Sequence, residues 1–184
     1  MMPFRKPLLR IFKTIMAKSM YLVPPQISTV EQGPGSVKKL PALIREKGFR
    51  KPLVVTDSIL MKMNLLKGLF REFDAIGMEY AVYDGVLPNP TIENVEEAYA
   101  LYARNGCDAI IGFGGGSPMD TAKVVAARVV RPGRTADRLG GYFKVTLPVP
   151  KRLPRIFAVP TTAGTGAETT SAAVVTDVRK NIKF

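Results

Sequence analysis

Short apolar segments alternate with segments of helical periodicity along this chain of 184 residues. Apolar runs bounded by turn residues predict buried strands, and the apolar stripes between them predict amphipathic helices. We expect strands at 52–57, 80–84, 107–113 and 155–159, helices at 36–48, 58–76, 92–105 and 118–130, and a closing hairpin with strands from 172 and 181. Such alternation with short connections favours right-handed crossovers. We therefore predict an α/β fold with a mainly parallel, Rossmann-like sheet and helices on both faces.

The chain contains no histidine and a single cysteine, Cys107. Without histidine, this chain alone completes no Ser-His-Asp or Cys-His catalytic group and no histidine-bound metal site. A single cysteine excludes a disulfide scaffold, and its place within an apolar strand predicts an inert core residue. Because 46% of the residues are hydrophobic, the chain has enough apolar material to bury a core.

The net charge is strongly positive, since 27 Lys and Arg face 15 Asp and Glu, a difference of 12. We divide the chain into a basic amphipathic N-terminal segment, residues 1–20, and one α/β domain, residues 21–184. The segment suits either a helix docked through its apolar face or attachment to a membrane surface. We favour the docked helix, and no apolar run has the length of a secretory signal or a membrane span, so we expect a cytoplasmic protein without a membrane partner. Positive charge attracts polyanions non-specifically, and no recognised motif predicts a specific nucleic-acid partner.

Glycines join the third predicted strand to the following helix in the sequence Gly114-Gly-Gly-Ser117-Pro118. Glycines let the backbone approach a bulky anion, and the first N–H groups of the helix point at that anion. The implied ligand is a diphosphate, although a tight turn that needs glycine only for steric reasons is the alternative. The segment matches neither the usual dinucleotide fingerprint nor a Walker A loop. Asp120 and Lys123 on the same helix could orient the loop or form a solvated pair, and we favour a structural role.

Two further groups of polar residues fall at the carboxyl ends of predicted strands, where parallel sheets bind ligands. Asp57 suits a ribose diol, which needs a carboxylate acceptor, although the same side chain could simply cap the next helix. Thr161, Thr162 and Thr165 offer hydroxyls on a glycine-containing loop. That loop suits either phosphate and nicotinamide contacts or a simple hydroxyl-rich turn.

The motifs at these strand ends resemble those of the iron-containing (group III) alcohol dehydrogenases. The resemblance rests on residues 112–123, 160–168 and 175–177, with 33–35, 55–57 and 84–91 in matching order and approximate spacing. It covers residues 21–184 and implies the N-terminal cofactor domain of a dehydroquinate synthase-like fold, with the helical C-terminal domain absent. The cofactor implied is NAD or NADP, and the reaction is hydride transfer between it and an alcohol or aldehyde.

Carried over to this chain, the resemblance assigns the adenosine half of the cofactor to two residues. Asp57 would hold the adenosine ribose, and Asn89 would lie beside the adenosine. Gly115, Gly116 and Ser117 would contact the pyrophosphate. Asp57 opposes a 2′-phosphate electrostatically, which favours NAD, while the excess of Lys and Arg leaves NADP open.

The same resemblance assigns the nicotinamide half to the second loop and to the end of the chain. Thr161, Thr162 and Thr165 would line the phosphate and the nicotinamide ribose, with Lys183 close to that ribose. In the family, a bound iron or zinc ion polarises the oxygen of a small alcohol or aldehyde substrate.

The resemblance also implies what this chain lacks. The family's metal ligands are one Asp and three His in the helical domain, and this sequence ends at Phe184 without a histidine. We therefore expect no metal ligand and no catalytic residue here, and a fragment that is inactive without the missing domain. The alternative is a natural, non-catalytic dinucleotide-binding module. An uncovered sheet edge favours assembly into a homo-oligomer.

Overall fold

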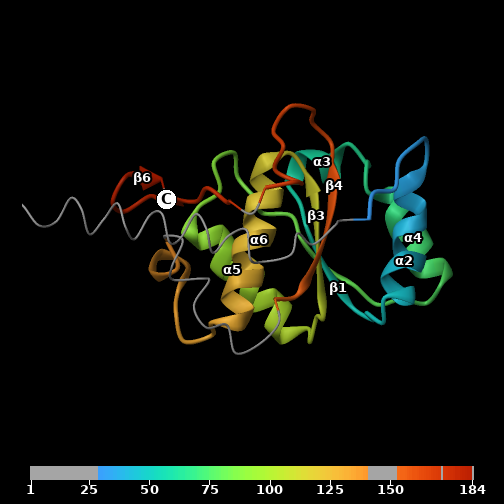
Figure 1. Cartoon of the computed structure of the whole chain (residues 1–184), viewed down its shortest axis with the longest axis horizontal. Helices are drawn as coiled ribbons and strands as arrows, with labels where there is room; N and C mark the ends of the chain where they lie inside the picture. The colour runs from blue at the N-terminus through green and yellow to red at the C-terminus, as the bar shows by residue number, and fades with distance from the viewer. Residues whose placement is uncertain (1–28, 141–152, 171, 184) are drawn as a thin grey trace, which may run out of the picture. The chain divides into compact units, whose positions relative to one another are not determined.

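The computed structural model describes residues 29–140, 153–170 and 172–183, so the predicted N-terminal segment 1–20 lies outside the described residues. The described residues from Gly35 onward belong to one compact unit. Its centre is a sheet of four parallel strands in the order β2-β1-β3-β4 (Figure 1). The strands are β1 (Pro52–Val55), β2 (Ala81–Tyr83), β3 (Ala109–Gly114) and β4 (Arg155–Pro160).

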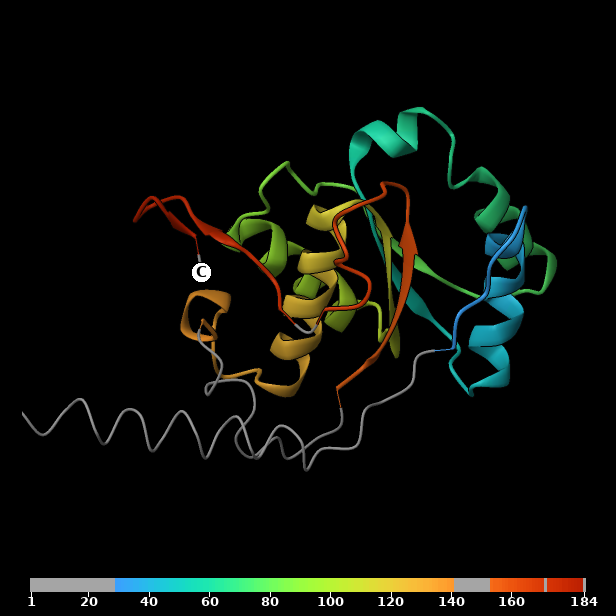
Figure 2. The ribbon, with the colours of Figure 1, turned by 45° about the horizontal axis from the view of Figure 1, so that its top comes forward.

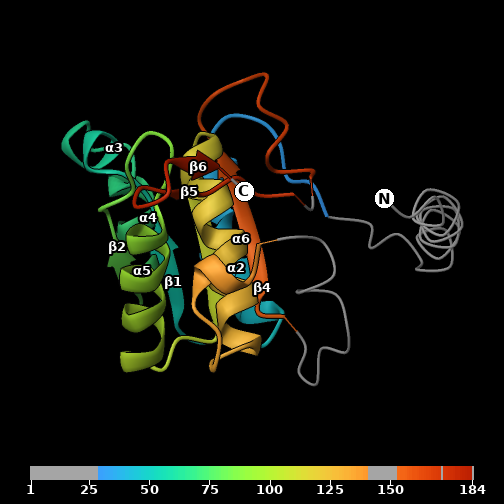
Figure 3. The same cartoon turned by 90° about the vertical axis from the view of Figure 1, so that its left-hand side faces the viewer.

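Helices cover both faces of this sheet. One face carries α5 (Ile92–Arg104) and α6 (Gly116–Val130), which stand in front of the strands in Figure 3. The other face carries the 3₁₀ helix η1 (Ser36–Lys39), α2 (Leu40–Glu46) and α4 (Lys67–Ala75). Side chains alternate between the two faces, since Leu53 and Val55 pack on the α5–α6 side and Val54 packs on the other. This arrangement confirms the predicted α/β fold.

The strand order creates a switch point between β1 and β3. The chain passes from β1 through α3 (Ser58–Lys62) and α4 to β2, then returns through α5 to β3 on the opposite side of β1. The direction of winding therefore reverses between these two strands. Open α/β sheets bind ligands outside the carboxyl ends of the strands at such a point. The residues after Val55 and after Gly114 lie there.

The helix predicted at 58–76 is wrong as one continuous element. It is divided into α3 and α4 by Asn64, whose φ of 58° is left-handed. Asparagine tolerates this conformation, but an α-helix does not continue through it. The apolar stripe does not form a single face either, because Leu66 and Leu69 are buried while Met63 is 61% exposed.

The start of α5 and the end of the described chain follow the sequence pattern. Thr91 Oγ1 accepts a hydrogen bond from Asn94 N, and Asn94 Oδ1 accepts one from Thr91 N, which is a reciprocal capping box. The predicted hairpin is present as antiparallel β5 (Thr176–Asp177) and β6 (Ile182–Lys183). Its first strand is shorter than the expected 172–177, because Ala172 O and Val174 N bond to side chains of α6 instead.

A buried ion pair holds the segment after α6 against α5. The Arg128 guanidinium donates to Glu96, with 2.8 Å from Nε to Oε1, and Ala136 N donates to the same carboxylate oxygen at 2.7 Å. Ala136 begins the 3₁₀ helix η2 (Ala136–Arg138) and is fully buried. Across the described ranges, no helix is both long enough and apolar enough to cross a membrane.

Candidate functional site

The turn between β3 and α6 leaves the start of a long helix uncapped. Gly115 is the N-cap residue in an extended conformation, and within the described ranges no side chain caps the first turn of α6. Pro118, predicted as the first helical residue, is the third, where a missing N–H is equally harmless. The N–H groups of Gly116 and Ser117 thus remain at the positive end of a 15-residue helix. This geometry suits an anion.

Glycine at position 114 is required by the backbone. Its φ is 143°, a conformation that other residues rarely adopt. A Cβ built there would lie 2.7 Å from Pro118 Cγ and 3.1 Å from Leu60 Cδ1. The steric reason offered as the alternative explanation for the glycine turn therefore holds at Gly114, whereas the next two glycines face the loop after β4.

The loop after β4, residues 161–170, is here called the threonine loop, and it lies against Gly115 and Gly116. Thr161 N donates to Gly114 O at 3.0 Å, which continues the β3–β4 pairing into the loop. A Cβ on Gly115 would be 3.0 Å from Thr162 Oγ1, and one on Gly116 would be 3.9 Å from Thr165 Cγ2. Figure 2 shows this loop rising from β4 and returning beside the first turns of α6.

The two loops therefore form one surface. The three predicted threonines on the loop, Thr161, Thr162 and Thr165, are all exposed. The threonine hydroxyls and the uncapped amides of α6 can both donate hydrogen bonds to the oxygens of a phosphorylated ligand. The structure brings the predicted glycine turn and the predicted threonine loop together, as a ligand bridging them requires.

Asp57 follows β1 and uses one carboxylate oxygen to cap α3. Its Oδ1 accepts hydrogen bonds from Ile59 N at 3.0 Å and from Leu60 N at 2.9 Å. The capping role considered from the sequence is therefore real. Oδ2 takes no part in this cap, so capping and contact with a ribose hydroxyl are compatible. The side chain is part-exposed, as a ligand contact requires.

Thr56, beside Asp57, is a polar residue that the sequence reasoning missed. It is fully buried, and within the described part of the chain its Oγ1 has no hydrogen-bond partner. An unpaired buried hydroxyl costs roughly 1–3 kcal/mol, so a water or a ligand at this strand end would stabilise it. The available signal was a hydroxyl residue that closes an otherwise apolar strand.

Asn89 and Lys183 meet at the surface, although their sequence positions are far apart. Lys183 Nζ lies 2.7 Å from Asn89 Oδ1. Asn89 has a left-handed φ of 57° in the loop after β2, and Thr176 N donates to the neighbouring Pro90 O at 2.8 Å. The β5–β6 hairpin is thus attached to the Asn89 loop.

The Asn89 loop is held from below by Asn94, a second residue that the sequence reasoning missed. The Asn94 side chain is 5% exposed and uses both its acceptor and its donor. Oδ1 accepts from Leu87 N and Thr91 N, while Nδ2 donates to Gly85 O and Tyr83 Oη. Burial, together with the hydrogen bond that the Tyr83 hydroxyl donates to Glu97, raises the pKa of Tyr83 above its ordinary value.

Cys107 and the acidic residues provide no metal centre in the described ranges. Cys107 is buried in the core between the sheet and the α5–α6 layer, as expected, and burial raises the pKa of its thiol to about 11. Among the residues that the structure describes, no three of His, Cys, Asp or Glu converge on a point where a metal ion could bind. These residues therefore do not fit a catalytic metal, and no chemistry through one follows from them.

Comparisons with known proteins identify relatives of this chain. A family model for iron-containing alcohol dehydrogenase matches residues 27–184. Lactaldehyde reductase of Escherichia coli (strain K12) is 38% identical over 156 residues, which cover 83% of this chain and 39% of that protein. NAD-dependent methanol dehydrogenase of Bacillus methanolicus is 34% identical over 152 residues, with the same two coverages.

A solved structure gives the same result for the fold. NADH-dependent butanol dehydrogenase A of Thermotoga maritima is similar with a TM-score of 0.72 and 30% identity, over 85% of this chain and 40% of that one. The present chain thus spans about two fifths of the length of these relatives.

Proposed function

Since the chain belongs to the iron-containing alcohol dehydrogenase family, we propose that it binds NAD at the carboxyl ends of β1 and β3. It would serve as the dinucleotide-binding part of an oxidoreductase for a small alcohol or aldehyde. The observation that carries this proposal is the uncapped N-terminus of α6, set against the hydroxyls of Thr162 and Thr165. A pyrophosphate accepts hydrogen bonds from backbone amides and from hydroxyls, and both kinds of donor are present.

The proposed cofactor contacts follow from these positions. The pyrophosphate lies on the amides of Gly115, Gly116 and Ser117, where the helix dipole is positive. The hydroxyls of Thr161, Thr162 and Thr165 donate hydrogen bonds to the phosphate and the nicotinamide ribose. Lys183 lies near that ribose. Asp57 accepts from the adenosine ribose through Oδ2. Asn89, which the resemblance would put beside the adenosine, lies with its Oδ1 2.7 Å from Lys183 Nζ, so we place it near the nicotinamide ribose instead.

The cofactor preference is for NAD. NADP carries a 2′-phosphate on the adenosine ribose, and the Asp57 carboxylate would repel that charge. The methanol and butanol dehydrogenases named above are described as NAD-dependent and NADH-dependent.

Activation of the substrate oxygen is not assigned to the described residues. The family name implies an iron ion, which acts as a Lewis acid on the substrate oxygen when the ion is bound. The described residues do not fit that ion, so we assign to them cofactor binding and no step of the hydride transfer. On this proposal the 184 residues alone do not turn over an alcohol; they act in a homo-oligomeric, cytoplasmic enzyme together with a helical metal-binding domain.

Titration calorimetry with NAD⁺ tests the anion site through Gly116→Asp. A Cβ at Gly116 meets nothing closer than 3.9 Å, and a carboxylate at the start of a helix favours the helix. The variant should therefore fold and lose NAD⁺ binding, because the new charge repels the pyrophosphate. Gly133→Asp is the matched control, since Gly133 lies in an exposed turn with open space around it. Unchanged NAD⁺ affinity in folded Gly116→Asp would refute the proposal.

A further inference from the structure

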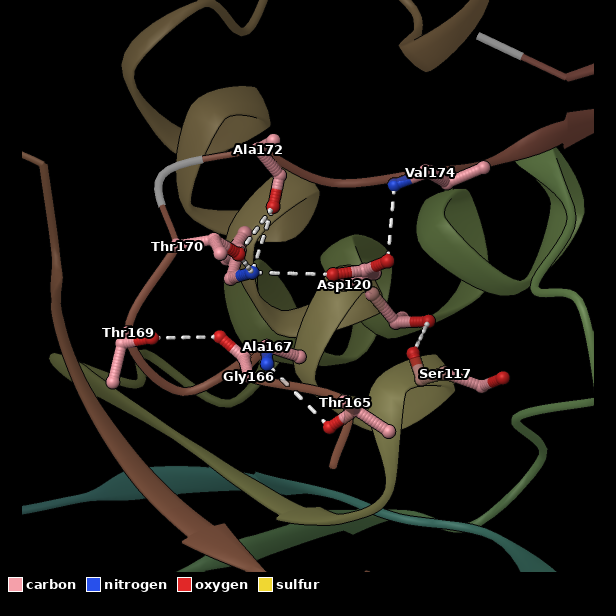
Figure 4. A network of polar contacts seen from close by, with 11 residues as sticks. Ser117, Asp120, Thr165, Gly166, Ala167, Thr169, Thr170, Ala172 and Val174 are labelled. Atoms are coloured by element: carbon pink, nitrogen blue, oxygen red, sulfur yellow. Dashed lines mark hydrogen bonds and ion pairs between the residues drawn. The ribbon is translucent and has the colours of Figure 1, made fainter. Parts of the chain in front are cut away.

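An ion pair on α6 also forms hydrogen bonds with the segment that follows the threonine loop. Lys123 Nζ lies 3.2 Å from Asp120 Oδ1 and also donates to Thr170 Oγ1 at 3.1 Å and to Ala172 O at 2.7 Å. Val174 N donates to Asp120 Oδ2 at 3.0 Å. Figure 4 shows these contacts joining the helix to the segment that crosses it.

The two side chains are largely shielded from water, and each of their charged atoms has a hydrogen-bond partner. The Asp120 and Lys123 side chains are 17% and 15% exposed, far less than an ordinary surface pair. Each Asp120 oxygen has its own partner, and two of the three contacts of Lys123 are to residues outside α6. These two charges therefore have their main partners at the end of the threonine loop and in the segment after it. An i, i+3 pair that only stabilised its own helix would not need partners outside that helix.

The threonine loop is attached to β3 and α6 by hydrogen bonds at its two ends, whereas the hydrogen bonds between these ends, such as Thr169 N to Gly166 O at 3.0 Å, join residues of the loop itself. At its start, Thr161 N bonds to Gly114 O, and at its end the ion pair holds Thr170, Ala172 and Val174. Between these points Gly164 and Gly166 have φ of 92° and 60°, conformations that glycine adopts at little cost. A glycine-containing loop without its second attachment would sample many conformations, and a ligand would have to order it.

We propose that Asp120 and Lys123 are positioning residues that hold the threonine loop against the N-terminus of α6, and so set the affinity for the nicotinamide half of the dinucleotide. This inference rests on the proposed function. The same helix provides the amides for the pyrophosphate and the charges that hold the facing loop. Both halves of the site therefore keep a fixed relative position before the cofactor arrives.

Comparing NAD⁺ with AMP separates positioning from general stability. AMP contains the adenosine and one phosphate, and lacks the second phosphate and the nicotinamide ribose, which are the groups that the threonine loop would contact. We expect Lys123→Met and Asp120→Ala to weaken NAD⁺ binding about ten-fold, the effect of losing a charge-assisted contact. AMP affinity should change less than about two-fold.

The control variant is Lys51→Met, which removes another cation from an ion pair. Lys51 Nζ is 2.7 Å from Glu79 Oε2, and Lys51 precedes β1 at the opposite end of the strand from Asp57. Neither NAD⁺ nor AMP affinity should change in this variant. Thr170→Val is a milder test if the α6 variants do not fold, because it removes one exposed acceptor of Lys123 and leaves the pair intact. It should weaken NAD⁺ about two-fold and leave AMP unchanged.

The outcomes distinguish this inference from the proposed function. Equal weakening of NAD⁺ and AMP, or no weakening of NAD⁺ in the folded variants, would overturn the positioning role alone. If the unsubstituted protein binds neither NAD⁺ nor AMP, the proposed function fails and the positioning role fails with it. Selective loss of NAD⁺ affinity supports both.

Discussion

Lys183 donates a hydrogen bond to Asn89, with 2.7 Å between Nζ and Oδ1, across 94 positions of sequence. The bond joins the closing hairpin to the loop after β2. It places a cation and an amide, both assigned to cofactor contacts, at the same point of the surface. Since both side chains are exposed, the bond itself contributes little to folding. On the proposed function, it would orient both groups for the cofactor.

Lys183→Met should therefore weaken NAD⁺ binding by roughly three- to ten-fold and change the free energy of unfolding by less than about 0.5 kcal/mol. Lys180→Met is the matched control, because Lys180 is a second exposed cation of the same hairpin and pairs with Asp177 at 3.1 Å. Calorimetry with NAD⁺ and urea unfolding measure the two quantities. An equal loss of NAD⁺ affinity in both variants would show a general charge effect and contradict a specific role for Lys183.

Asp57 caps α3 and, on the proposed function, would also bind the adenosine ribose, and substitution can separate these two roles. Asp57→Asn keeps an oxygen to cap α3 but removes the charge, whereas Asp57→Ala removes both. We expect the Ala variant to lose about 1 kcal/mol of folding free energy and the Asn variant to lose little. Both variants should bind NADP⁺ relatively better than the unsubstituted protein, because the repulsion of the 2′-phosphate is gone. An unchanged ratio of NADP⁺ to NAD⁺ affinity would remove Asp57 from the ribose site.

The two central glycines of the turn should respond differently to a methyl group. A Cβ on Gly115 would approach Thr162 Oγ1 to 3.0 Å, whereas one on Gly116 would have 3.9 Å to its nearest neighbour. We expect Gly115→Ala to displace the threonine loop and weaken NAD⁺ binding on the order of ten-fold, with a smaller effect for Gly116→Ala. Calorimetry on both variants provides the comparison, and a larger loss for Gly116→Ala would contradict this packing of the two loops.

Stability should fall at alkaline pH because of buried acids in the core. Burial raises the pKa of the Cys107 thiol from 9.0 to about 11, and that of the Tyr102 hydroxyl from 10.0 to about 12. As the pH rises above 9, the unfolded chain loses these protons first, so the folded state binds more protons. The free energy of unfolding therefore decreases with pH in this window.

Cys107→Ala should reduce that pH dependence. Between about pH 8 and pH 10 we expect the unsubstituted protein to lose about 1–2 kcal/mol that the variant retains, measured by urea unfolding at both values. The comparison is of the change with pH and not of absolute stability, since the variant also loses packing. The same decrease with pH in both proteins would exclude Cys107 as its source.

Much of the fold could be predicted from local patterns. The strand–helix alternation and the closing hairpin depend on neighbours in sequence, and both are present. The pattern failed where a single backbone conformation decided the outcome. Asn64 interrupts the helix expected at 58–76, because a left-handed residue ends a helix whatever the apolar spacing around it.

The sequence by itself determined the alternating α/β architecture and the residue types at the strand ends, because apolar periodicity and turn chemistry act over a few residues. Only the tertiary structure decided which of those ends meet. The parallel pairing of β3 with β4 brings Thr162 to Gly115. The path of the chain after β4 brings Thr170, Ala172 and Val174 to Asp120 and Lys123. These contacts join residues 47 or more positions apart, at distances set by the register of the sheet and not by any local preference.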